Sequence, residues 1–142
     1  MTQKENRLLL IDLSARLLYN VKCLVNFKGT TEVMTLKTGL PNEFGNYEFE
    51  NEKCSLCSND FKPYLRSLKD MTEKEKWECI GFSRTKAISG VYDLVDFTIT
   101  NPDFVDWLNS HFFDYRGLIE KGLAIRVTKE NNPYKDQLGD IF

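Results

Sequence analysis

A chain of 142 residues is long enough for one domain with a hydrophobic core and no disulfide bonds. Its composition, 42% hydrophobic and 28% charged, excludes disorder over most of the chain. The net charge of -2 excludes a global basic field that would attract nucleic acid, and it also excludes the strong acidity of a protein that mimics DNA.

The N-terminal sequence predicts no signal peptide and no membrane span. Its apolar run at 8–11 is cut short by Asp12, whereas a signal peptide has a longer apolar stretch and a small-residue cleavage site. No segment reaches the roughly 20 apolar residues of a membrane-spanning helix. We therefore expect a cytoplasmic protein that does not enter a membrane and whose cysteines are reduced.

The first predicted element is an amphipathic helix over 6–17. Leucines recur there at the spacing of one helix face, and this face is expected to be buried. These leucines are Leu9, Leu10, Leu13 and Leu17. Asp12 lies mostly outside their stripe.

Two strands joined by a turn are predicted next. Residues 21–27 alternate between apolar and polar side chains, and 31–38 are rich in β-branched residues. The intervening residues, 28–30, contain a glycine, so the two strands are expected to form a hairpin. Residues 47–50 alternate again and predict a third strand, whereas the polar segment 51–60 is expected to be a loop.

An extended segment and a second helix follow. Pro63 fixes its own backbone and disfavours helix before it, so 61–65 are expected to be extended. Thr72 and Glu75 have the spacing of a capping box, in which each side chain accepts a hydrogen bond from the other residue's amide. In the helix that they start, Trp77 is expected to face inward.

The remaining chain predicts a strand, a helix, a further strand and a tail. Residues 87–100 are rich in β-branched and aromatic residues. A helix start is predicted at 101–103, where an asparagine cap precedes a proline and an acid. Residues 123–127 predict the last strand, and 131–142 are expected to be a loose C-terminal tail.

These elements together predict an α+β fold. It should contain the N-terminal helix, a small antiparallel sheet of about four to six strands and two further short helices packed on it. Antiparallel pairing is expected because hairpin-like turns join the strands, whereas parallel strands need long crossovers. No domain boundary is visible, so residues 1–142 are expected to form a single domain.

Cys54 and Cys57, in the motif CSLC, have the most chemical character of any motif in the chain. Structural zinc takes four ligands, and the other candidates, Cys23, Cys79 and His111, stand at no recognisable spacing. Thiol redox chemistry would favour a pair at a helix start, whereas the surroundings predict a loop. We therefore expect no metal and no cofactor, with a metal site at Cys54 and Cys57 as the alternative.

A turn with several functional groups is predicted at Asp114, Tyr115, Arg116 and Gly117. One interpretation is a recognition loop, with Tyr115 and Arg116 at the rim of an interface. The other, which we favour, is a structural turn in which Asp114 binds backbone amides and Gly117 has a positive φ. His111, just before it, is expected to be a helix C-terminal residue rather than a catalytic base.

Motifs of enzymes are absent from the sequence. There is no glycine-rich phosphate loop, no nucleophile elbow and no pair of histidines, so we expect a protein that is not an enzyme. The most basic neighbourhood, 74–86, interleaves Trp77 and Phe82 with cations such as Arg84 and Lys86, and could touch nucleic acid. A solvated helix face that also carries glutamates explains the same residues more simply.

Three segments of the chain carry a resemblance to a known group of proteins. They are the opening at 8–21, a middle block at 62–75 that contains Lys-Pro-Tyr-Leu-Arg, and the ending at 114–124 that contains Asp-Tyr-Arg-Gly-Leu-Ile. In this order they resemble uncharacterised small proteins carried by phages and prophages of Bacteroidales-type bacteria. The opening departs from the group's pattern, with Ser14 and Leu18 where a cysteine and a proline usually stand. The resemblance implies a small cytoplasmic protein expressed from a mobile element, and it assigns no activity.

The lack of enzyme motifs, the aromatic surplus and this context lead to one functional expectation. We expect a non-enzymatic factor that binds a host or phage protein in the bacterial host, for example an inhibitor of host defence such as an anti-CRISPR. The alternative is a nucleic-acid-binding accessory protein in phage replication or regulation, which the charge supports less.

Overall fold

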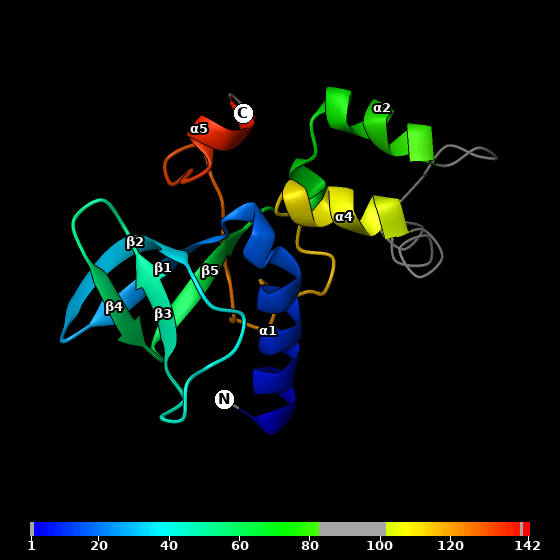
Figure 1. Cartoon of the computed structure of the whole chain (residues 1–142). Helices are drawn as coiled ribbons and strands as arrows, with labels where there is room; N and C mark the ends of the chain where they lie inside the picture. Colours follow the sequence, from blue (N-terminus) through cyan, green and yellow to red (C-terminus); the bar gives the residue numbers. More distant parts are fainter. Residues whose placement is uncertain (1, 83–101, 140) are drawn as a thin grey trace.

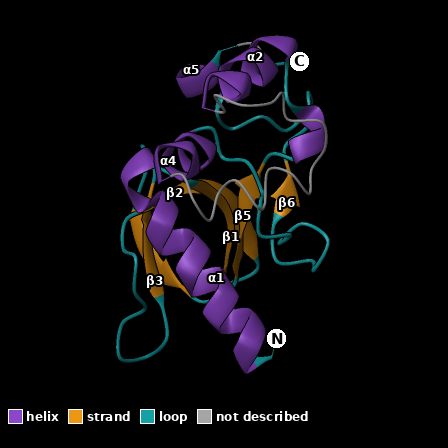
Figure 2. Ribbon diagram, turned by 90° about the vertical axis from the view of Figure 1, so that its right-hand side faces the viewer, coloured by secondary structure: helices purple, strands orange, loops and turns teal. Residues whose placement is uncertain are grey.

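The computed structural model describes residues 2–82, 102–139 and 141–142, and it has an α+β fold. The N-terminal helix, α1 (Gln3–Arg16), lies across one face of a curved six-stranded sheet, as Figure 1 and Figure 2 show. The shorter helices lie beside the sheet (Figure 1). The strand expected at 87–100 falls outside the described residues.

α1 begins earlier than its leucine pattern predicts, because a capping box precedes it. The Thr2 hydroxyl accepts a hydrogen bond from the Glu5 amide at 3.1 Å, and the Glu5 carboxylate accepts one from the Thr2 amide at 3.4 Å. Leu9 and Leu13 are buried in the main core, which fills the space between α1 and the sheet. A 3-10 turn, η1 (Leu17–Tyr19), follows the helix directly.

The sheet has the strand order β4-β3-β2-β1-β5-β6. Its strands are β1 (Lys22–Phe27), β2 (Thr30–Leu36), β3 (Tyr47–Glu50), β4 (Ser55–Ser58), β5 (Phe61–Leu65) and β6 (Ile125–Arg126). Neighbouring strands are antiparallel except β5 and β6, which are parallel. The Ser58 hydroxyl, at the end of β4, donates to the carbonyl of Asn26 in β1 at 2.9 Å, so the sheet curls back on itself at this end.

The predicted hairpin is confirmed, and its turn explains its geometry. Lys28 and Gly29 have φ values of 53° and 81°. Positive φ at both central residues gives a turn whose twist matches that of the flanking strands. The predicted strands at 47–50 and 61–65 are also confirmed, as β3 and β5.

Two predictions about strands are wrong. The segment 51–60, expected to be a loop, contains β4, which pairs with β3 through backbone hydrogen bonds although its side chains lack apolar alternation. The last strand is shorter than 123–127 and runs parallel to β5, because the chain returns to the sheet after a long excursion through the helices.

The helices of that excursion form a second, smaller core. α2 (Glu73–Phe82) starts with the predicted capping box: the Glu75 carboxylate accepts from the Thr72 amide at 2.9 Å, and the Thr72 hydroxyl accepts from the Glu75 amide at 3.2 Å. α4 (Pro102–Ser110) begins at proline as predicted. The buried residues of this second core are Cys79, Phe104, Leu108 and Phe113. A short 3-10 turn, η2 (Leu68–Asp70), links β5 to α2.

The prediction of a loose C-terminal tail is wrong at Tyr134. This side chain is fully buried, and its hydroxyl accepts from the Lys22 amide at 2.9 Å and donates to the Tyr64 carbonyl at 2.7 Å. Its ring stacks on that of Phe112 with centroids 3.8 Å apart. A short helix, α5 (Lys135–Leu138), follows, so one aromatic anchor attaches this segment to the core.

Candidate functional site

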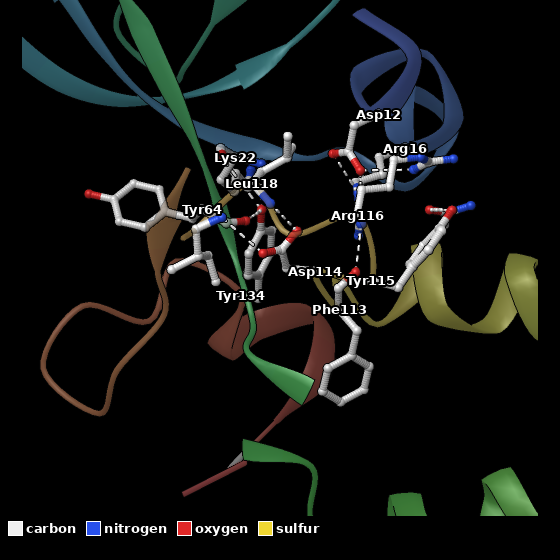
Figure 3. Close-up of polar contacts among 12 residues, drawn as sticks. Asp12, Arg16, Lys22, Tyr64, Phe113, Asp114, Tyr115, Arg116, Leu118 and Tyr134 are labelled. Atoms are coloured by element: carbon white, nitrogen blue, oxygen red, sulfur yellow. Dashed lines mark hydrogen bonds and ion pairs between the residues drawn. The ribbon is translucent and has the colours of Figure 1, made fainter. Parts of the chain in front are cut away.

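Asp114 builds the turn that the sequence marks as a candidate site. Its two carboxylate oxygens accept hydrogen bonds from the amides of Leu118 and Ile119, each at 2.9 Å (Figure 3). Gly117 has a φ of 77°, a conformation that other residues rarely adopt. The structural interpretation of Asp114 and Gly117 therefore describes the geometry of the turn.

Arg116 reaches from this turn to α1. Its guanidinium donates to Oδ1 of Asp12 at 2.8 Å, and 20% of the Arg116 side chain is exposed. Asp12 itself is fully buried, so the prediction that it lies mostly outside the buried stripe of α1 is wrong. The same carboxylate also binds Arg16, one helical turn later, with Nε–Oδ2 and Nη2–Oδ1 distances of 2.9 and 3.1 Å.

Arg16 extends the network to the segment before the turn. Its Nη2 donates to the Phe113 carbonyl at 2.6 Å, and the whole side chain is buried (Figure 3). Its Nη1 is a buried donor without a hydrogen-bond partner among the described residues, and the guanidinium lies 5.5 Å from the centroid of the Tyr115 ring. The electron-rich face of that ring offsets part of the missing hydrogen bond.

Tyr115 is held from three sides. Its hydroxyl donates to Oδ1 of Asn109 at 2.9 Å. The guanidinium of Arg116 lies 4.5 Å from the centroid of the Tyr115 ring, and the guanidinium of Arg16 lies 5.5 Å from it. The hydroxyl and the aromatic ring are therefore both engaged within the protein. Tyr115 is only partly exposed.

The structure thus connects Arg116 directly to the buried carboxylate of Asp12. Tyr115 joins this network through the guanidiniums of Arg116 and Arg16, whereas the Asp114 side chain binds backbone amides within the turn. Two guanidiniums share the Asp12 carboxylate, and removing it would leave both cations without their counterion in or near the core. These contacts join α1 to Phe113, just before the turn, and to Arg116, within the turn. Sequence reasoning missed Asp12 and Arg16, although their spacing of four residues on a helix is a signal for an ion pair.

A second buried ion pair ties Arg66, the residue directly after β5, to α2. The guanidinium of Arg66 donates to both carboxylate oxygens of Glu75 at 2.7 Å and lies 4.3 Å from the centroid of the Phe113 ring. Burial alone would raise the pKa of Glu75, but hydrogen bonds from Arg66 and from the Thr72 amide lower it overall from its ordinary value of 4.5. Sequence reasoning found Glu75 as a capping residue and missed Arg66.

The side chain of His111 takes part in neither network, although the backbone carbonyl of His111 accepts a hydrogen bond from Nη1 of Arg66 at 3.3 Å. Its Nδ1 lies 2.9 Å from the carbonyl of Trp107 and 3.1 Å from the hydroxyl of Ser110. The imidazole stacks on the Trp107 ring with centroids 4.3 Å apart, and its Nε2 is 3.9 Å from Glu78. These contacts match a histidine at a helix end that binds the last carbonyls.

The four cysteines lie apart in two kinds of environment. Cys54, directly before β4, and Cys57, within β4, are exposed. Cys23 is buried in the main core and Cys79 in the second core. Burial raises the pKa of the Cys23 thiol far above its ordinary value and that of Cys79 to about 12. Among the described residues, no group of three or more histidines, cysteines and acids is placed to hold a metal ion.

The basic neighbourhood is described only in its first half, on α2. The prediction that Trp77 faces inward is wrong, since 71% of its surface is exposed. Lys76 is paired with Glu73 at 3.1 Å, so part of the positive charge on α2 is neutralised by a neighbouring acid. Arg84 and Lys86 lie outside the described residues, as does the side chain of Phe82.

Large apolar side chains stand at the surface of the described part of the chain. Four of them are more than two-thirds exposed: Leu18 (88%), Phe44 (77%), Trp77 (71%) and Leu40 (69%). The segments that carry Leu18 and Leu40 touch through residues just before these two leucines. A Cβ at Gly39 would lie 3.3 Å from Cδ2 of Leu17, and the Gly39 carbonyl accepts from the Ser14 hydroxyl at 3.0 Å.

None of the described helices has the length and apolar character to cross a membrane. Comparisons of the chain with known protein families, with curated proteins and with solved structures found no match.

Proposed function

We propose that this chain is a non-enzymatic protein-binding factor that acts in the cytoplasm of a bacterial host. The observation that carries the proposal is the set of exposed apolar side chains. We define the Leu18–Leu40 patch as these two leucines, 88% and 69% exposed, on adjoining segments at the end of α1. Exposed apolar side chains that gather on a surface are typical of sites that bind another protein.

The charged groups of the core support a binding role rather than a catalytic one. Both buried carboxylates that the structure describes, Asp12 and Glu75, are held by arginines. A carboxylate in such a pair is occupied by its hydrogen bonds and is poorly placed to take a proton from a substrate. His111 is likewise engaged with a backbone carbonyl.

The partner is proposed to be a host or phage protein. The support is the resemblance of three segments to small proteins of Bacteroidales-type phages, because proteins of mobile elements commonly act on the host. Inhibition of host defence, for example of a CRISPR effector, is the extension of the proposal that follows from this context.

The experiment is affinity purification from host cells, with nuclease added to the lysate. Wild type is compared with Leu18→Ser/Leu40→Ser, with Trp77→Ala, and with the matched control Phe27→Ser/Val33→Ser, which removes two apolar side chains that are 40% and 44% exposed on the β1–β2 hairpin. We expect wild type and control to capture one stoichiometric protein, and we expect Leu18→Ser/Leu40→Ser to lose it. Capture that is equal in all four proteins would contradict the proposal.

Defence inhibition has its own readout. Phage plaques are counted on an immune host that expresses either wild type or the binding-deficient variant. We expect wild type to raise the plaque count and the variant to leave it at the level of the empty vector. If wild type has no effect in any immune host, the extension fails while protein binding stands.

A further inference from the structure

A cleft of about 580 Å³ opens between the first half of α1 and the loop that follows the Asp114 turn. Four of its lining residues, Lys4, Arg7, Leu8 and Ile11, come from α1 at the spacing of one helix face. The loop contributes Lys121. This face is the opposite of the one buried against the sheet, where Leu9 and Leu13 lie.

The cleft has an unbalanced positive charge. Lys4, Arg7 and Lys121 are exposed, and none of the three forms an ion pair with another described residue. The acid that lines the cleft is Glu5, whose carboxylate is already engaged with Thr2 in the capping box. Hydrogen bonds from Thr2 lower the pKa of Glu5, so the capping contact is made by its charged form.

Beside these cations the cleft is apolar. Leu8 is partly buried, and 48% of Ile11 is exposed. An occupant that fits both features has carboxylates for the cations and an aliphatic side chain for Leu8 and Ile11.

We infer that this cleft binds an acidic segment with an aliphatic side chain on the partner protein. The inference rests on the proposed protein-binding function and names the chemistry of the partner. A peptide is favoured over nucleic acid for two reasons. None of the described lining residues is aromatic, so bases would lack a ring on which to stack, and the chain as a whole carries a net charge of -2.

The test measures fluorescence anisotropy of a labelled peptide of glutamates around one central leucine. Wild type is compared with Lys4→Glu/Arg7→Glu/Lys121→Glu. The matched control is Lys62→Glu/Lys74→Glu/Lys129→Glu, which makes the same change in net charge at exposed lysines elsewhere. The cleft variant should fold, because its side chains are exposed and because acids in the first turns of a helix are favourable; thermal melting of both variants checks this.

We expect wild type and control to bind the acidic peptide, with an affinity that falls as salt is added, and the cleft variant to bind at least tenfold more weakly. A peptide with lysines in place of the glutamates should not bind. The inference is overturned by no binding of the acidic peptide to wild type, by an equal loss in the control, or by tighter binding of a single-stranded oligonucleotide.

The same variants separate this inference from the proposed function. If the cleft variant still captures the host or phage partner that wild type captures, the acidic-segment inference fails and protein binding stands. If wild type captures no partner in the nuclease-treated lysate, the proposed function itself fails.

Discussion

Arg116 donates a 2.8 Å hydrogen bond to the buried carboxylate of Asp12, which lies 104 residues earlier in the chain. The contact joins the turn near the C-terminus to the middle of α1, and Arg16 binds the same carboxylate from the next helical turn. The turn at 114–117, one interpretation of which was a recognition loop, therefore forms a structural contact with α1. We call this contact the Asp12–Arg116 link.

Asp12→Asn tests how much the Asp12–Arg116 link and the Asp12–Arg16 pair stabilise the fold. The substitution keeps the size of the side chain and removes the charge, which leaves the buried guanidinium of Arg16 without its counterion. We expect the free energy of unfolding to fall by about 3–5 kcal/mol, measured by urea denaturation. Glu120→Gln, at an exposed acid in the same region, is the control and should change it by less than about 0.5 kcal/mol. Equal stability of the two variants would mean that the charge of Asp12 contributes nothing to the free energy of unfolding.

Arg116→Ala should cost less than Asp12→Asn. Arg16 still neutralises Asp12 in this variant, and Arg116 is partly exposed, so only one charged hydrogen bond and its contact with Tyr115 are lost. We expect a loss of about 1.5–3 kcal/mol in the same denaturation experiment. A loss larger than that of Asp12→Asn would contradict the assignment of Asp12 as the centre of the network.

The Arg66–Glu75 pair makes the stability of the fold depend on pH in the acidic range. The pKa of Glu75 is lowered in the folded protein, so its contribution to stability is fully present above the unfolded pKa, about 4.5, and is lost as the pH falls through the folded pKa. Glu75→Gln should therefore be less stable than wild type at pH 7 and lose less stability between pH 6 and pH 3. Glu73→Gln, an exposed acid on the same helix, should keep the wild-type pH dependence in thermal melts.

The thiols should react in two classes. Burial raises the pKa of Cys79 to about 12 and that of Cys23 further, and it also blocks access to both. Iodoacetamide at pH 8 should modify Cys54 and Cys57 in the native protein, and all four cysteines after unfolding in urea. Mass spectrometry of the labelled peptides gives the result. Rapid native labelling of Cys23 would show that its core is open.

Cys54 and Cys57 should be dispensable for folding. Both side chains are exposed, and β4 is held by backbone pairing with β3. We expect Cys54→Ser/Cys57→Ser to melt within about 2 °C of wild type. We also expect EDTA to leave the melting temperature unchanged, since chelation of a structural zinc would unfold the protein. Stoichiometric zinc by elemental analysis would contradict this prediction.

The parts of the fold that sequence reasoning found are those with a local cause. The β1–β2 hairpin depends on alternating strands and on a turn at Lys28 and Gly29, and the start of α2 depends on Thr72 and Glu75, three residues apart. Each of these signals lies within a few neighbouring residues. They could be read before the fold was known.

The parts that were missed depend on contacts between distant segments. β4 has polar residues and is defined by its pairing with β3, and Tyr134 is buried because Lys22 and Tyr64 bring backbone groups to its hydroxyl. The leucine spacing alone places Asp12 outside the buried stripe, and one of the two partners that hold its carboxylate in the core, Arg116, is remote in sequence. Its other partner, four residues away, was a readable signal.

The central claim, that this chain binds a protein through its exposed apolar side chains, is tested most directly by measuring the mass of the complex in solution. The partner captured from host cells is purified, mixed with wild type or with Leu18→Ser/Leu40→Ser in the presence of nuclease, and analysed by size-exclusion chromatography with light scattering. We predict a stoichiometric complex with wild type and at least tenfold weaker association with the variant. Separate elution of wild type and partner, or association that nuclease abolishes, would contradict the claim.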